Sequence, residues 1–147
     1  MKVGRRRGRV LAFQALYAWD VGNIPAADLL DFSWYEKNEN ENSDDLFLFP
    51  RLLFLSALEH IEEIDAAIKP RLKHWDFDRI TRVDKAVLRL GTYSLLFQHE
   101  VVPQIIINEA VNLARMYGTD DSFRFVNAVL DSIKKECLEL SYEDTAQ

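Results

Sequence analysis

Apolar residues recur three and four positions apart in one segment of the chain after another, and strict alternation of apolar and polar residues is rare. This spacing places apolar side chains on one face of an α-helix, which has about 3.6 residues per turn. Only five glycines and four prolines interrupt the 147 residues, so turn signals are few. The pattern therefore predicts an all-α protein.

Six or seven helices are predicted from these apolar stripes. The first helix covers about Gly8 to Val21. The second is short and is expected to bury one face, formed by Ala27, Leu30 and Trp34. The longer stripes run from just before Pro50 towards Pro70, from Thr81 to Phe97, from Pro103 to Tyr117, and from near Asp120 to Cys137.

Several single residues predict how these helices end and pair. Thr81 and Asp84, three positions apart, resemble an N-terminal capping pair. Gly118 follows the end of a stripe and is expected to be a left-handed C-terminal residue. Arg89 and Glu109 are each embedded in an apolar stripe, so we expect them to form a structural ion pair between neighbouring helices.

Two segments have no apolar stripe. Residues 36–45, EKNENENSDD, contain no apolar residue, so burial cannot offset the entropy of ordering them. We expect a mobile acidic loop there and regard it as the best internal boundary. The polar residues 141–147 are expected to fray. Even so, the length fits a single domain over residues 1–147.

The composition favours an intracellular, non-membrane protein. Cys137 is the only cysteine, so no intramolecular disulfide is possible. The N-terminal sequence does not resemble a signal peptide, and no apolar run approaches the roughly 18 residues of a membrane-spanning helix. A reducing cytoplasm is the expected location.

Basic residues are concentrated at the N-terminus. Residues 1–9 contain five of the 18 basic residues, four of them arginines, and no acid. The other 138 residues therefore carry 13 bases and 24 acids, and the whole chain has a net charge of −6. Such segregation suggests a site for an anionic partner. The alternative is a basic tail, or a segment that pairs with the acidic residues 36–45.

Aromatic residues follow the arginines closely and favour nucleic acid as the anionic partner. Phe13, Tyr17 and Trp19 lie within three helical turns of the cluster, and single-stranded RNA is commonly held by stacking on aromatic or guanidinium planes. Phe13 and Trp19 are expected in the core. Gln14 and Tyr17, three apart on one helix face, are the better candidates for exposure.

No catalytic or metal-binding motif is present in the sequence. The three histidines lie on separate segments, without an HExxH pattern or paired cysteines. The isolated glycines form no phosphate loop, and no serine or cysteine has a nucleophile-elbow context. Paired carboxylates such as Asp120–Asp121 are explained more simply as helix caps or solvated faces. Neither an enzyme nor a cofactor is expected.

Four blocks of sequence resemble the bacterial NusB family of transcription antitermination factors, in the order found in that family. The first is the arginine cluster with the following Gln14-Ala15-Leu16-Tyr17. The others are Asp84 to Leu90, Val102-Pro103 with Ile107 to Ala114, and Gly118 to Asn127. No single block is decisive, but together they are distributed from residue 5 to residue 127.

This resemblance implies a non-enzymatic fold of two packed three-helix bundles. It also implies binding of single-stranded boxA RNA in ribosomal RNA leaders, together with NusE, a small-subunit ribosomal protein, within the antitermination complex of RNA polymerase. The RNA-facing residues would be Arg5, Arg6, Arg7, Arg9, Gln14, Asp121, Ser122, Arg124 and Phe125. The NusE-facing residues would be Tyr17, Asp76, Asp78 and Asp84. Some members of the family are expected to form homodimers.

The chain departs from the family pattern at a few positions. Gly8 stands where alanine is common, so the first helix is expected to fray at its start, and Ala128 replaces a usual glycine. Two alternatives to an antitermination factor stay open. One is the NusB-like domain of a ribosomal RNA cytosine methyltransferase, and the other is a helical scaffold that binds protein but not RNA.

Overall fold

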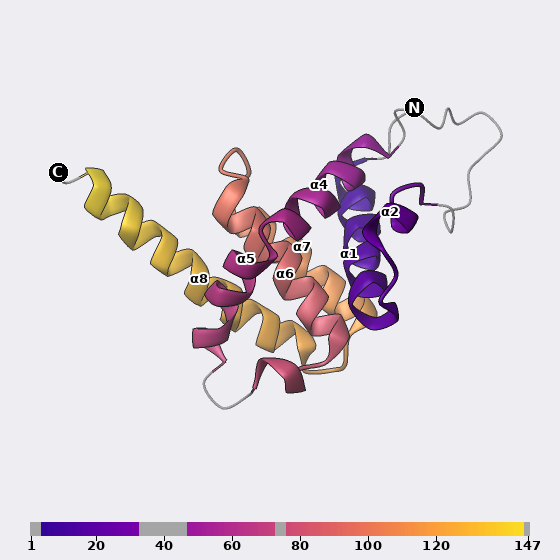
Figure 1. Cartoon of the computed structure of the whole chain (residues 1–147). Helices are drawn as coiled ribbons and strands as arrows, with labels where there is room; N and C mark the ends of the chain where they lie inside the picture. Colours follow the sequence, from indigo (N-terminus) through magenta and orange to yellow (C-terminus); the bar gives the residue numbers. More distant parts are fainter. Residues whose placement is uncertain (1–3, 33–46, 73–75, 146–147) are drawn as a thin grey trace. The chain divides into compact units, whose positions relative to one another are not determined.

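The computed structural model describes residues 4–32, 47–72 and 76–145, and every regular element within these ranges is helical (Figure 1). The predicted all-α class is therefore confirmed. The predicted acidic loop at 36–45 and the predicted core residue Trp34 lie outside the described residues.

The chain divides into two compact units, Met1–Glu59 and His60–Gln147. This division does not fall at residues 36–45, where we expected the internal boundary. It lies instead within the stripe that predicted one helix from Pro50 to Pro70. That prediction was wrong, because α4 (Leu48–Glu59) and α5 (Ile61–Ile68) are separate helices. His60 between them has φ −106° and ψ 20°, which does not continue a helix.

The first unit contains α1 (Arg5–Gly22), α2 (Ala26–Leu29) and α4. Helix α1 packs against α4, and Phe32 stacks on Phe47 with ring centroids 5.1 Å apart. The predicted face of α2 was wrong, because Leu29 is buried while Ala27 is exposed and Leu30 is half-buried. The larger buried side chains of this unit are Leu11, Phe13, Leu16, Leu29, Phe32, Phe47, Leu53 and Phe54.

Helix α1 begins at Arg5, three residues before the predicted start. The predicted fraying at Gly8 was also wrong. Gly8 is buried, and a Cβ atom at this position would overlap the ring of Phe49. The absence of a side chain at Gly8 therefore allows α1 and the start of α4 to approach closely.

The second unit contains α5, the 3₁₀ helices η1 (Lys69–Arg71) and η2 (Phe77–Arg79), α6 (Arg82–Phe97), α7 (Pro103–Tyr117) and α8 (Ser122–Thr145). Helix α6 contacts α5, α7 and α8 (Figure 1). Its residues are buried without interruption from Asp84 to Thr92. A Cβ atom at Gly91 would lie 2.8 Å from the Leu130 side chain of α8. Gly91 therefore permits the close packing of α6 on α8.

Helix α8 is longer than predicted. Its apolar stripe lies largely as expected, since Val126, Leu130 and Ile133 are buried, while Phe123 and Cys137 are half-buried. The helix continues to Thr145 and so includes most of the polar tail at 141–147, whose fraying stays a prediction.

The Thr81 half of the predicted capping pair of α6 is confirmed, because the backbone N–H of Asp84 donates to Thr81 Oγ1 at 3.1 Å. The left-handed conformation predicted for Gly118 was wrong, since its φ is −92° and its ψ is −167°. Glycine is needed there for space. A Cβ atom would lie 2.7 Å from the Ala114 carbonyl oxygen and 2.6 Å from Ser122 Cβ.

Arg89 forms a nearly buried ion pair with Asp65 of α5. Its Nε and one terminal nitrogen donate to the two carboxylate oxygens at 2.9 and 3.0 Å. The bidentate geometry fixes both side chains. The predicted pairing of Arg89 with Glu109 stays a prediction.

Candidate functional site

The first turn of α1 carries three exposed arginines, Arg5, Arg6 and Arg7. Gly4 occupies the N-cap position and provides no side-chain cap, and the first turn contains no acid. The first amide groups of a helix have no partner within the helix and carry its positive dipole end. Amide donors and guanidinium groups are therefore concentrated at one helix start, which is suited to an anion.

The remaining predicted residues of α1 lie on different sides of the helix. Arg5 and Arg9 are one turn apart on the side of Gly8 and Phe49, and Arg9 is half-buried. Gln14 and Tyr17 are neighbours on another face. The structure confirms exposure for Tyr17, of which 37% is accessible, and leaves Gln14 half-buried. Phe13 is buried as predicted, whereas Trp19 is only half-buried.

The start of α8, in the second unit, carries the other predicted RNA-facing residues. Asp121 and Arg124 are exposed and lie 3.7 Å apart as an ion pair, and Phe125 is half-buried. Ser122 differs from the other three, because none of its surface is accessible. Its Oγ accepts the backbone N–H of Thr119 at 2.9 Å. The Ser122 hydroxyl therefore holds the turn before α8 in place.

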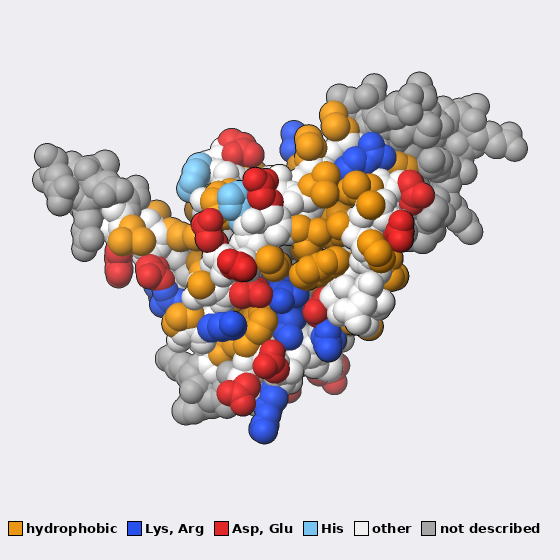
Figure 2. Space-filling model, in the orientation of Figure 1, with side chains coloured by type: hydrophobic (Ala, Val, Ile, Leu, Met, Phe, Trp, Pro, Cys, Tyr) orange, Lys and Arg blue, Asp and Glu red, His pale blue; other side chains and the backbone are white. Residues whose placement is uncertain are grey.

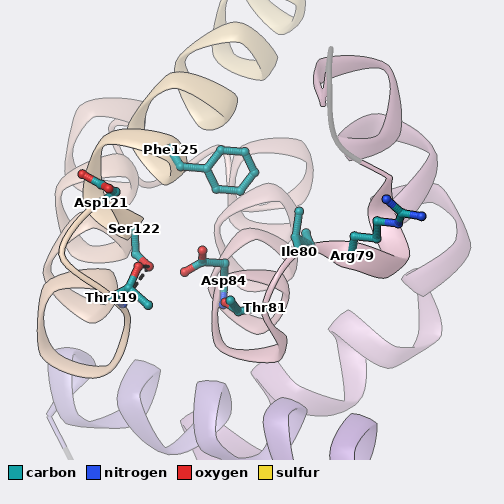
Figure 3. A pocket seen from close by; sticks show the side chains of 8 residues that line it. All are labelled: Arg79, Ile80, Thr81, Asp84, Thr119, Asp121, Ser122 and Phe125. Atoms are coloured by element: carbon teal, nitrogen blue, oxygen red, sulfur yellow. Dashed lines mark hydrogen bonds between the residues drawn. The ribbon is translucent and has the colours of Figure 1, made fainter.

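A pocket of about 310 Å³ lies between the starts of α6 and α8 (Figure 3). The carboxylate of Asp84 points into it from α6, and Phe125 borders it from α8. Asp84 is only 7% exposed, and its buried Oδ1 atom has no hydrogen-bond partner. The lining residues are Arg79, Ile80, Thr81, Asp84, Thr119, Asp121, Ser122 and Phe125. A donor group entering the pocket would satisfy this carboxylate oxygen.

The 3₁₀ helix η2 and the residue that caps its start carry two of the predicted acids. Asp76 and Asp78 are exposed on either side of Phe77. The Phe77 ring is contacted by two cations of α6, with Lys85 Nζ at 4.5 Å and Arg89 Cζ at 5.3 Å from its centroid. These cation–π contacts hold the turn while both carboxylates stay accessible.

Sequence reasoning missed several residues of these surfaces. Arg79, Ile80 and Thr119 line the pocket, yet nothing local in the sequence links the start of α6 with the start of α8. Phe123 was expected in the core, but its half-buried ring is contacted by two guanidinium groups, with Arg115 Cζ at 4.6 Å and Arg124 Cζ at 5.2 Å from the ring centroid. The alternation of Arg and Phe at positions 123–125 was a signal that could have indicated these contacts.

Two side chains of α8, Asp131 and Cys137, have pKa values that depart from their usual range. Hydrogen bonds from Lys135 and Lys134 lower the pKa of the Asp131 carboxyl. Burial raises the pKa of the Cys137 thiol, although the nearby charge of Arg71 opposes this. A raised pKa disfavours the thiolate, so Cys137 is a poor nucleophile at neutral pH.

Charges of both signs are mixed on the face of the molecule shown in Figure 2, with apolar side chains between them. The strong segregation of basic residues is therefore a feature of the α1 start and not of this face in general. Among the described residues, no group of three or more potential ligands could hold a metal ion. No described helix is long and apolar enough to cross a membrane.

The fold and these surfaces define an all-helical protein with a basic helix start in one unit and an acid-lined pocket in the other. A family model described as the NusB family matches residues 6–135, and the chain belongs to this family.

The similarity to known proteins extends over nearly the whole length of the chain. The transcription antitermination protein NusB of Treponema pallidum is 57% identical, covering 91% of this chain and 94% of that protein. The structure of T. maritima NusB has a TM-score of 0.81 at 34% identity, covering 92% of this chain and 94% of that one. A crystal structure of the antitermination factors NusB and NusE in complex with dsRNA has a TM-score of 0.76 at 32% identity, covering 90% of this chain and 96% of that one. These relatives are antitermination proteins, a non-enzymatic family.

Proposed function

We propose that this protein is a transcription antitermination factor that binds boxA RNA of ribosomal RNA leaders together with NusE and couples it to elongating RNA polymerase in the cytoplasm. Its role is that of an adaptor, in which one surface takes RNA and another takes protein. The observation that carries this proposal is the exposed triplet Arg5, Arg6 and Arg7 in the uncapped first turn of α1.

Cations in the first helical turn oppose the helix dipole, so this arrangement lowers the stability of α1. An anionic ligand removes the conflict, since phosphate groups bind both the free amides and the guanidinium groups. Nucleic acid supplies phosphates at a regular spacing, which matches several arginines on one helix start. The proposed RNA surface on α1 therefore consists of Arg5, Arg6, Arg7, Arg9 and Gln14.

The start of α8 supplies a second proposed contact with RNA. Arg124 adds an exposed positive charge, Phe125 offers a stacking face, and Asp121 can accept hydrogen bonds from a base. Ser122 is assigned a different role from the other three. Because it is fully buried and bonded to Thr119, we propose that it shapes the turn that presents Asp121 and Phe125.

The acidic surfaces are proposed to bind NusE. The carboxylate of Asp84 lies in the pocket with an unpartnered oxygen, and Asp76 and Asp78 are exposed at the start of η2. A ribosomal protein is expected to be basic, so opposite charge favours this encounter. Tyr17 is exposed on α1 and offers both an aromatic face and a hydroxyl. A similar NusB, found in a complex with NusE and dsRNA, supports the choice of these partners.

The RNA assignment is tested by titrating single-stranded boxA RNA at several salt concentrations. If four arginines meet phosphates, log K should fall against log salt with a slope near −3, from about −0.7 per contact on a single strand. Changing Arg6→Ala and Arg7→Ala together should weaken binding and bring the slope to about −1.5.

The matched control for that experiment is the double change Lys134→Ala and Lys135→Ala, which also removes two adjacent positive charges, from α8. It should leave both affinity and slope nearly unchanged. If binding ignores salt and the arginine double change, the protein is a helical scaffold without a role for these arginines in RNA binding.

The protein-binding surface is tested by Asp84→Lys. This charge reversal should weaken binding of NusE at least tenfold, because the lysine would repel the basic group of NusE that is expected to meet the Asp84 carboxylate. Binding of boxA RNA without NusE should fall less than binding of NusE, although Asp84 shares its pocket with Asp121 and Phe125. Glu100→Lys, at an exposed position in the loop between α6 and α7, is the control of equal charge change. Equal losses of RNA and NusE binding would contradict separate surfaces.

Sedimentation of the free protein, with and without RNA, tests the predicted homodimer.

A further inference from the structure

Phe49 lies against the start of α1, although it belongs to the first turn of α4. Its ring occupies the space that a side chain at Gly8 would need, and Pro50 Cδ is 3.5 Å from the same point. The ring is half-buried, so one part packs on α1 and another part faces outward. This aromatic ring is thus built into the surface that carries the arginines.

The guanidinium of Arg5 lies over the Phe49 ring, with Cζ 4.3 Å from the ring centroid. Arg9, one helical turn later, approaches the same ring at 6.0 Å. Arg5 is exposed, and the ring of Phe49 is its interaction partner within the described residues. The contact restricts the long Arg5 side chain, which would otherwise sample many rotamers.

We infer that Phe49 is a positioning residue for RNA, which holds the Arg5 guanidinium so that its N–H groups meet a phosphate of the bound strand. The inference rests on the proposed function, since RNA is the ligand. A guanidinium presents its five N–H donors in its own plane, so stacking one face on a ring leaves the donors at its edge for phosphate. Gly8 serves the same purpose, because it makes room for the ring.

The Phe49 ring is expected to contribute modestly to the affinity for RNA and not at all to its salt dependence. Exposed cation–π contacts are weak, and the loss of one corresponds to about a two- to fivefold loss of affinity. Phe49 carries no charge, so the number of neutralised phosphates should not change when it is replaced. An unchanged salt slope with reduced affinity therefore distinguishes a positioning residue from a direct phosphate contact.

The test compares Phe49→Leu, Arg5→Ala and the double variant of the full chain, using fluorescence anisotropy with labelled single-stranded boxA RNA across salt. Phe49→Leu keeps an apolar side chain but removes the ring, and should weaken binding two- to fivefold at an unchanged slope. Arg5→Ala should weaken binding and reduce the slope by about 0.7. The double variant should bind like Arg5→Ala, because the ring has nothing left to position.

Leu52→Ala is the control on the same helix, because Leu52 is exposed on α4 and should not affect RNA. Thermal melting checks each variant for folding. If Phe49→Leu unfolds the protein, Arg5→Lys tests the contact from the other side. Lysine keeps the charge and the slope but cannot stack as a planar group, so affinity should fall while the slope stays.

The possible outcomes distinguish a failure of the proposed function from a failure of the role assigned to Phe49. Salt-independent binding by the wild type would overturn the proposed function and this inference together. Wild-type affinity for Phe49→Leu, combined with a weakened Arg5→Ala, would overturn the inference alone. Additive effects in the double variant would do the same, because they would show that the ring acts without Arg5. In the Arg5→Lys experiment, an unchanged affinity for RNA would overturn the inference about Phe49.

Discussion

The starts of α1 and α6 differ in their N-terminal capping and in the charge of their first turns. Helix α6 begins with a side-chain cap from Thr81 and has Asp84 in its first turn, both of which favour a helix start. Helix α1 begins at Gly4 without a side-chain cap and places three arginines where the helix dipole disfavours cations. The first arrangement stabilises the fold, whereas the second lowers the stability of α1, and we propose that it serves to bind an anion.

The same contrast holds for two arginines that each lie on an aromatic ring. Arg89, on Phe77, is 8% exposed and bonded to Asp65, which is 17% exposed. Arg5, on Phe49, is exposed at the surface. Burial makes the first contact structural, while exposure leaves the second available to a ligand. Similar local chemistry thus stabilises one unit and, under the proposed function, serves RNA binding in the other.

The largest effect is expected from Arg89→Ala. It would leave the largely buried carboxylate of Asp65 without its bidentate partner, so we expect a loss of about 3 kcal/mol in the free energy of unfolding. Urea denaturation measures this. Arg124→Ala, which removes an exposed ion pair, is the control and should change stability by less than about 0.5 kcal/mol. Equal effects of the two changes would remove the distinction between buried and exposed arginines.

A smaller loss is expected from Thr81→Ala. Removing the Oγ1 acceptor leaves the Asp84 amide without its cap, and the free energy of unfolding should fall by about 1 kcal/mol. Thr81→Ser keeps the hydroxyl and should cost only a few tenths of this. If alanine and serine are equally tolerated, the side-chain cap does not stabilise the start of α6.

A gain of stability is expected at the other helix start, from Gly4→Asp. Gly4 has φ −63° and ψ 161°, which any residue can adopt, and a Cβ atom there would meet no neighbour within 4 Å. A capping carboxylate should raise the free energy of unfolding by about 0.5 kcal/mol and weaken RNA binding, because it competes with phosphate for the arginines. Gly4→Ala, which adds no cap, should show neither effect. Lower stability of the aspartate variant would show that the α1 start does not conflict with the helix dipole.

The smallest effect concerns Asp131, whose pKa is lowered by Lys135 and Lys134. A carboxyl with a lowered pKa in the folded state contributes stability above its ordinary pKa and loses it as the pH falls through the folded-state value. Asp131→Asn should therefore cost a few tenths of a kcal/mol at neutral pH and nothing in strong acid. Melting temperatures of both proteins across pH measure the difference, and a difference independent of pH would contradict this origin.

Most helices were predictable because their signals are local. The stripe of α6, its Thr81 cap and the Pro103 start of α7 all depend on residues within one or two turns. The break between α4 and α5 was not predictable, since the apolar stripe continues through it. His60 at the break stacks on Phe97 at 4.2 Å, a contact between positions far apart in the sequence. The extended Gly118 was missed because its small size is required by Ser122 and Ala114.

The sequence by itself determined the all-α class, the separation of charge and the residues that resemble the NusB family, because these depend on spacing and residue type. Only the tertiary structure decided which of these residues are available to a ligand. It buries Ser122, which the family resemblance had assigned to RNA, and it brings Asp84 and Phe125 together in the lining of one pocket. It also places Phe49 beneath Arg5. Such contacts join residues that are distant along the chain, so they depend on how helices pack and not on any local pattern.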